Sequence, residues 1–308
     1  MCVFERGPIV ATRQRKKTVQ FFEVVNSDGS RIENGSLDWQ EILFDLSRQH
    51  IRDRRHRIGG IDHWGQIYPY NGDEHFILAK NREDGVSSFD IENEEFIDSE
   101  TQAGNPYVEL TIIKFIPGTN RFGLVLGSGA SSRAGTFQIW LNEHRVFAEE
   151  ISVKPLVSNR VLEKIQGAQQ AKLLNVRLER DQAAAVSEAN GLYGAVRAIT
   201  AVHGSVDVEL ILRVKGQVDS RHDDERISIL NTARSVINTQ FSKAMVELVQ
   251  FDQEGKPETE TVNFVNDLLS KKMKVSVTDE EGHPVRIPSA IAAIDRAIDD
   301  LQSEFDAL

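Results

Sequence analysis

A stretch of ten residues, 48–57, carries five arginines and two histidines in a chain that is otherwise net acidic. If the helix expected before this stretch continues through it, Arg48, Arg52 and Arg55 fall on one stripe, because they are spaced four and three residues apart. Such a stripe contacts phosphates along a nucleic-acid backbone without reading the base sequence. The alternative is a solvated helix end that complements the helix dipole or pairs with the acidic segment at 83–100. The predicted nucleic-acid contacts of this stretch are Arg48, Arg52, Arg54, Arg55 and Arg57.

A second basic group, at residues 13–17, precedes the first expected strand. We expect residues 1–16 to form a flexible tail that ends in this group. Lys16 and Lys17 are predicted to help the arginines hold a polyanion, because each can neutralise one phosphate.

A segment rich in glycine and serine, residues 127–135, follows an expected strand and precedes a possible helix, which is the setting of a phosphate-binding turn. Ser132 stands where a dinucleotide-binding motif needs its third glycine, and the segment lacks the lysine of a P-loop. A flexible connection is therefore the alternative, and no cofactor is predicted. The candidate anion donors of this loop are Ser128, Ser131, Ser132 and Arg133.

Metal-dependent or nucleophilic catalysis has little support in the residue spacing. The eight histidines do not form a metal-binding pattern, no serine lies in a nucleophile elbow, and Cys2 is the only cysteine. No metal site is therefore predicted. Asp90 and Glu92 would share one face of an extended segment, so a nuclease or nucleotide hydrolase that uses them with the loop at 127–136 remains an open alternative.

The composition is that of a globular protein, with 308 residues, 40% hydrophobic residues and a net charge of −11. Because the net charge is negative, the protein as a whole does not attract nucleic acid. Any surface that binds nucleic acid must therefore be a local basic patch. The chain has no apolar run of about 18 residues and no apolar segment near its start that is typical of a secretory signal, so we expect a cytoplasmic protein.

The first half is predicted to be mostly antiparallel strands. A strand is expected at 18–25, and Ser36 or Asp38 can cap a helix that follows. Asn71-Gly72-Asp73 and the turn at 117–120 each indicate a β-hairpin, whereas the acidic residues 83–105 are interpreted as a loop.

In the second half, strands and helices alternate, with a helix expected at 259–269 and a closing helix at 288–305. The closing helix has an apolar stripe through Ile291, Ile294 and Ile298, which either packs on its own sheet or forms the seam of a homodimer. We therefore predict an α+β protein. Its parts would be the tail, a mainly antiparallel domain at 17–147 and a ferredoxin-like α/β sandwich at 148–308.

The order of these segments resembles the RexA family of phage-exclusion proteins. It runs from KKTVQFFEVV through FIPGTNRFGLVLGSGASS and ISVKPLVSNRVLEKI to VDVELILRVK and KAMVELVQFDQEG. The same order of segments resembles, more loosely, that of the Kiwa defence component KwaB. The similarity spans residues 17–305 and is one of pattern and order, without a single specific motif.

The resemblance implies a homodimer in antiviral defence that binds DNA or a phage nucleoprotein complex. It also implies a partner, often a membrane protein encoded nearby, and it supplies no catalytic residues. The leading hypothesis is thus a non-enzymatic phage-exclusion component. The rivals are the enzyme described above and a protein-interaction scaffold.

Overall fold

Strand β1 (Gln14–Asn26) pairs with three other strands in the larger of two main sheets in the computed structural model. The structure describes residues 13–82, 86–90, 95–99, 107–178, 192–204, 206–216, 218, 220–237, 241–252, 254–264, 268–279, 283 and 286–308. Side by side, the strands of the larger sheet are β14 (Ser270–Ser276), β1, β8 (Arg121–Leu126), β7 (Val108–Phe115), β4 (Asp73–Asn81), β3 (Ile61–Tyr70) and β2 (Arg55–Ile58).

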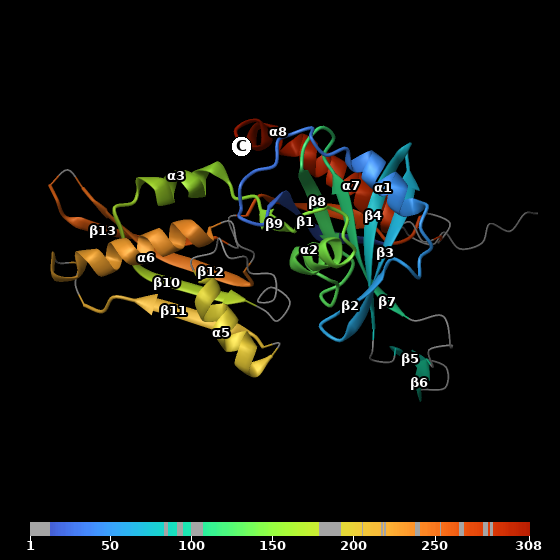
Figure 1. Cartoon of the computed structure of the whole chain (residues 1–308), viewed down its shortest axis with the longest axis horizontal. Helices are drawn as coiled ribbons and strands as arrows, with labels where there is room; N and C mark the ends of the chain where they lie inside the picture. The colour runs from blue at the N-terminus through green and yellow to red at the C-terminus, as the bar shows by residue number, and fades with distance from the viewer. Residues whose placement is uncertain are drawn as a thin grey trace, which may run out of the picture.

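The smaller sheet is built from β11 (Val208–Arg213), β10 (Gln170–Leu178), β12 (Lys243–Phe251) and β13 (Pro257–Asn263), and all its pairings are antiparallel. Its core is formed with three helices, which are α3 (Asn159–Gly167), α5 (Tyr193–His203) and α6 (Asp223–Val236). The short helix η1 (Ser220–His222) leads into α6. Figure 1 shows this part of the molecule beside the larger sheet. The predicted α+β class is confirmed, and the ferredoxin-like detail stays a prediction.

The chain returns to the larger sheet after leaving it. Strand β9 (Ile151–Pro155) pairs with the end of β1, and β14 pairs with its beginning. This corrects two boundaries that we predicted. The segment 148–308 does not form one sheet of its own, and the flexible tail does not reach residue 16, because the strand begins at Gln14.

Several local predictions hold. The Asp38 side chain accepts hydrogen bonds from the amides of Gln40 and Glu41 and so caps helix α1 (Trp39–Ser47). Asn71 and Gly72 both have positive φ, as a two-residue hairpin turn between β3 and β4 requires.

Two other predictions are wrong. Residues within the acidic loop form a hairpin of β5 (Val86–Asp90) and β6 (Glu95–Ser99), and β13 occupies much of the segment expected to be a helix.

Helix α7 (Arg286–Asp300) covers the larger sheet, and the short helix α8 (Gln302–Asp306) follows it (Figure 1). Its apolar stripe is buried, since Ile291 and Ile294 are completely inaccessible and pack against Val19 and Val125 of the sheet. A Cβ atom at Gly123 would lie 2.4 Å from Ile294, so a glycine is needed for the helix to approach β8 this closely. The stripe therefore packs on its own sheet, and a dimer seam at this place is excluded.

We predict that Ile294→Ala destabilises the fold by about 2–5 kcal/mol, because it leaves a cavity between α7 and the sheet. The free energy of unfolding in urea measures this effect. Val202→Ala is the control, because Val202 is 75% exposed and its truncation should change stability by less than about 0.5 kcal/mol. Equal effects of the two substitutions would contradict the packing described.

Candidate nucleic-acid interface

The basic stretch 48–57 does not continue the preceding helix. Helix α1 ends at Ser47, Arg48 is its C-cap, and Arg55 already begins β2. A turn separates the two elements, in which the amide of Asp53 donates to the carbonyl oxygen of His50. The predicted stripe of Arg48, Arg52 and Arg55 on one helix face is therefore wrong, because this turn ends the helical spacing.

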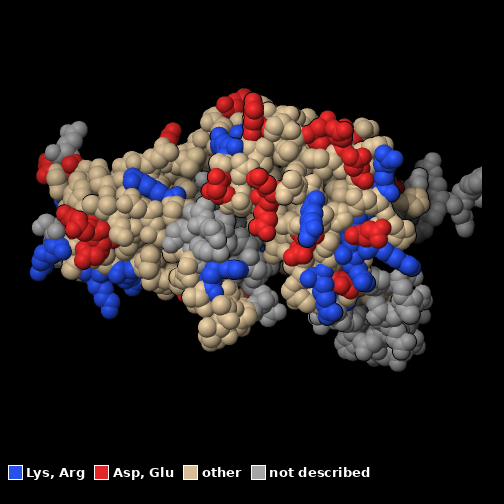
Figure 2. Space-filling view, viewed as in Figure 1, with Lys and Arg blue, Asp and Glu red and all other residues tan. Residues whose placement is uncertain are grey.

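The arginines of this stretch have different environments. Arg48 and Arg52 are exposed, and no partner is recorded for their side chains among the described residues. Arg55 lies 3.9 Å from Asp62, and Arg57 donates from Nε to the carbonyl oxygen of Gly60 at 2.8 Å. Figure 2 shows lysine and arginine side chains at the end of the molecule that carries β2 and β3, with acidic side chains among them. These exposed cations remain accessible to a polyanion.

Arg54 is a buried cation and not a surface contact. Its side chain is inside the fold, its Nε and Nη1 atoms have no hydrogen-bond partner, and burial lowers the pKa of its guanidinium. Its carbonyl oxygen accepts from Trp140 Nε1 and from the amide of Gly65. These contacts join the residue that precedes β2 to β3 and to helix α2 (Ala134–Glu143). The structure therefore corrects the prediction that Arg54 contacts phosphate.

Beside Arg54, a pair of histidines was not predicted from the sequence. His56 Nε2 lies 2.9 Å from His144 Nδ1, and His144 Nε2 lies 2.8 Å from Gln49 Oε1. The His144 ring stacks on Trp140, with ring centroids 4.7 Å apart. Burial lowers the pKa of both histidines, and for His144 the neighbouring His56 and Arg54 lower it further. Because 88 positions separate the two histidines, no spacing rule could have found them.

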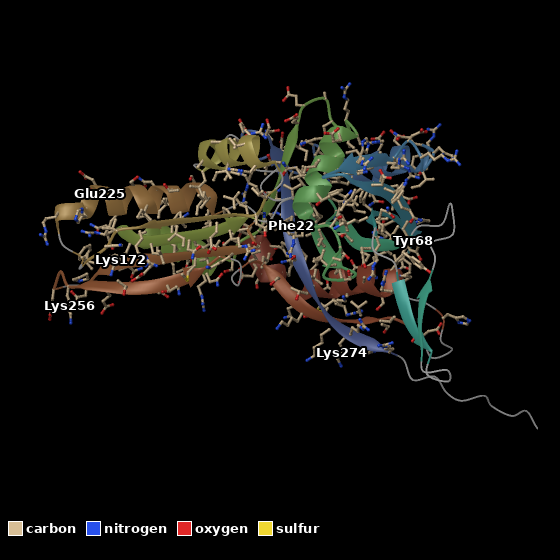
Figure 3. All side chains as sticks on the ribbon, turned by 90° about the horizontal axis from the view of Figure 1, so that it is seen from below. Phe22, Tyr68, Lys172, Glu225, Lys256 and Lys274 are labelled. Atoms are coloured by element: carbon tan, nitrogen blue, oxygen red, sulfur yellow. The ribbon has the colours of Figure 1, made fainter. Side chains whose placement is uncertain are left out.

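Lys16 and Lys17 lie in a different place, on a ribbon of two strands. The β1 segment Gln14–Gln20 pairs with the whole of β14, and Lys16 lies directly opposite Lys274. Together the two paired segments carry six lysines and arginines and no acidic residue. The members of this basic ribbon are Arg15, Lys16, Lys17, Lys271, Lys272 and Lys274. Figure 3 shows Lys274 on the exposed side of this ribbon.

The charge of the basic ribbon is only partly neutralised. Lys271 pairs with the carboxylate of Asp300 of α7 at 3.4 Å. Lys17 keeps its charge but is held in place, because it donates to the carbonyl oxygen of Gly127. Lys16, Lys272 and Lys274 are exposed, and no ion pair is recorded for them within the described part of the chain. Burial lowers the pKa of Lys17, and the positive charges of Arg15 and Arg286 lower it further. Exposed positive charges are therefore concentrated here in a net acidic protein.

The serine-rich loop lies next to the basic ribbon, through the bond between Lys17 and Gly127. Its polar groups are used largely within the fold. Ser128 Oγ donates to Glu109, and the amide of Ser128 donates to Ser131 Oγ at 2.9 Å. Ser131 and Ser132 are buried, whereas Arg133 is partly exposed at the start of α2. These contacts give the loop a structural role, and its anion-binding role stays a prediction.

The alternative catalytic site falls largely outside the described residues. This holds for Glu92 and for the side chain of Asp90, although the backbone of Asp90 belongs to β5. Within the described part of the chain, no three His, Cys, Asp or Glu side chains are arranged to hold a metal ion. In the same part of the chain, none of the helices combines the length and the apolar character needed to span a bilayer.

Comparison of the chain with models of protein families finds no match, and a search of curated protein sequences finds none either.

The histidine pair predicts a pH dependence of stability. A histidine whose pKa is lower in the folded than in the unfolded chain binds fewer protons when the chain is folded. Protonation therefore stabilises the unfolded chain, and the free energy of unfolding decreases as the pH falls below about 6.5. His56, His144 and the buried His75 all have a lowered pKa. We expect the urea midpoint to decrease between pH 8 and pH 5.

In His144→Phe, which keeps a ring against Trp140, this decrease should be smaller than in the unmodified protein. His203→Gln is the control, because His203 is exposed and its substitution should leave the pH dependence unchanged. An equally steep decrease in His144→Phe would show that the pair does not titrate as described.

Proposed function

We propose that this protein is a cytoplasmic component of bacterial defence against phage that binds nucleic acid, most readily DNA, without regard to sequence. The basic ribbon carries the proposal. Nucleic-acid affinity of this kind comes from lysines and arginines that displace counterions from phosphates. The basic ribbon supplies several such groups in one place, although the whole chain has a net charge of −11.

The exposed arginines Arg48, Arg52, Arg55 and Arg57 supply a further set of cations at β2 and the turn before it. In the proposal they make additional phosphate contacts, and the basic ribbon makes the principal ones. The ranking follows from the arrangement of the charges. Lys16, Lys272 and Lys274 lie on two paired strands without an ion pair among the described residues, whereas the four arginines are divided between a turn and β2, and Arg55 lies near Asp62.

The biological setting in the proposal comes from the resemblance to the RexA family. In that setting the protein is a homodimer that binds phage DNA or a nucleoprotein complex and signals to a partner, such as a membrane protein encoded nearby. The α7 stripe is not available for the homodimer contact, because it is buried in its own sheet.

Substitution of three lysines tests the proposal. We predict that Lys16→Gln/Lys272→Gln/Lys274→Gln weakens binding of a fluorescently labelled 30-base-pair DNA, because three phosphate contacts are lost. The slope of log K against log salt concentration should become shallower by about 1 per lysine removed. Fluorescence anisotropy at several salt concentrations measures both effects.

The matched control is Lys172→Gln/Lys215→Gln/Lys256→Gln, which removes the same charge from the part of the molecule that holds the smaller sheet. Lys172 and Lys256 lie far from Lys274 in Figure 3. The control should keep the affinity and the slope of the unmodified protein. If both triple variants bind equally, the basic ribbon is not the interface, and if the unmodified protein binds no DNA at low salt, the proposed function is wrong.

A further inference from the structure

The basic ribbon continues beyond the rest of the sheet as two strands. The pairing of β8 with β1 starts at Val19 and that of β9 starts at Phe22, so residues 14–18 of β1 form ladder pairs with β14 alone among the described strands. Figure 3 shows the two strands running together to the region of Lys274. A two-stranded element of this kind is narrow enough to enter a groove that a full sheet cannot enter.

One face of this ribbon is packed. The other, which we call the free face, is exposed among the described residues at Gln14, Lys16, Thr18, Lys272 and Lys274 and half-buried at Gln20, Ser270 and Ser276. Val19 and Val275 are buried against α7, and Met273 packs beside them. Because alternate side chains of a strand point to opposite faces, the residues between them lie on the free face. These residues are Gln14, Lys16, Thr18 and Gln20 on β1 and Ser270, Lys272, Lys274 and Ser276 on β14.

The composition of the free face indicates whether it binds single-stranded or double-stranded nucleic acid. It has no aromatic side chain, whereas proteins that hold single strands usually stack bases on aromatic rings. Its lysines can contact phosphates, and its glutamine, serine and threonine side chains can form hydrogen bonds with base edges. The face therefore fits a duplex, whose groove offers base edges between two rows of phosphates.

The dimensions of the groove distinguish DNA from RNA. The major groove of B-form DNA, about 12 Å wide, admits a two-stranded β-ribbon, whereas the major groove of A-form RNA is deep and narrow. Lys272 and Lys274 are two residues apart on one strand, about 6.6 Å, and Lys16 lies opposite Lys274. The ribbon thus presents cations on both of its strands, with neutral hydrogen-bonding groups before and after them.

We propose that the basic ribbon binds double-stranded DNA by placing its free face in the major groove, with α7 packed behind it. This inference rests on the proposed function and makes it specific. It assigns the principal contacts to the two strands and names B-form DNA as the ligand.

Two duplex probes test the groove. A DNA duplex whose cytosines are all glucosylated 5-hydroxymethylcytosine has the same phosphates as ordinary DNA, but its sugars fill the major groove. We expect it to bind at least tenfold more weakly than the unmodified duplex at equal salt, as measured by fluorescence anisotropy. An RNA duplex of the same sequence should also bind at least tenfold more weakly. Equal affinity for the ordinary and the glucosylated DNA would overturn the inference.

Substitution of the neutral groups gives a second test. Gln14→Ala/Thr18→Ala keeps every charge, so the salt slope should stay unchanged while the preference for ordinary over glucosylated DNA decreases severalfold. An unchanged preference in this variant would place the groove contacts elsewhere and refute the assignment to this face. Failure of the proposed function looks different, because none of the three duplexes would then bind at low salt.

Discussion

The antiparallel pairing of β1 with β14 is the interaction on which the candidate interface depends. It joins strands that are more than 250 residues apart in the sequence and places two basic segments side by side. Like charges directly opposite each other destabilise a sheet, and Lys16 faces Lys274. The ladder of backbone hydrogen bonds and the burial of Val19 and Val275 against α7 hold these charges together. The proposed contact with nucleic acid would relieve this repulsion, because each phosphate offsets one of the positive charges.

Helix α2 organises the other part of the candidate site. Trp140 lies over Gly65, where a Cβ atom would come within 2.3 Å of the indole ring, and it also donates to the carbonyl oxygen of Arg54. The same helix leads to His144, which meets His56 of β2. The residues of the basic stretch 48–57 therefore fall into a buried group and an exposed group. Arg54 and His56 are drawn toward the core beside α2, while the arginines on either side remain exposed.

Local features of the fold could be predicted from the sequence, and long-range ones could not. The strand around Phe21 and Phe22, the cap at Asp38 and the turn at Asn71 depend on neighbouring residues, and all three are present. Lys16 and Lys17 were found by their charge, but their partner strand and the His56–His144 pair depend on contacts across the whole chain. The prediction of a helix at 259–269 is wrong because the first residues of this segment pair with β12 and form a strand.

The most direct measurement is the reactivity of individual lysines toward an acetylating reagent, followed by mass spectrometry with and without duplex DNA. The account predicts that Lys16, Lys272 and Lys274 lose reactivity together when DNA is bound, because they lie on one face of one ribbon. Lys215 and Lys256, which lie outside the ribbon, should react as before. Protection of Lys215 and Lys256 with continued reactivity of the three ribbon lysines would contradict the account.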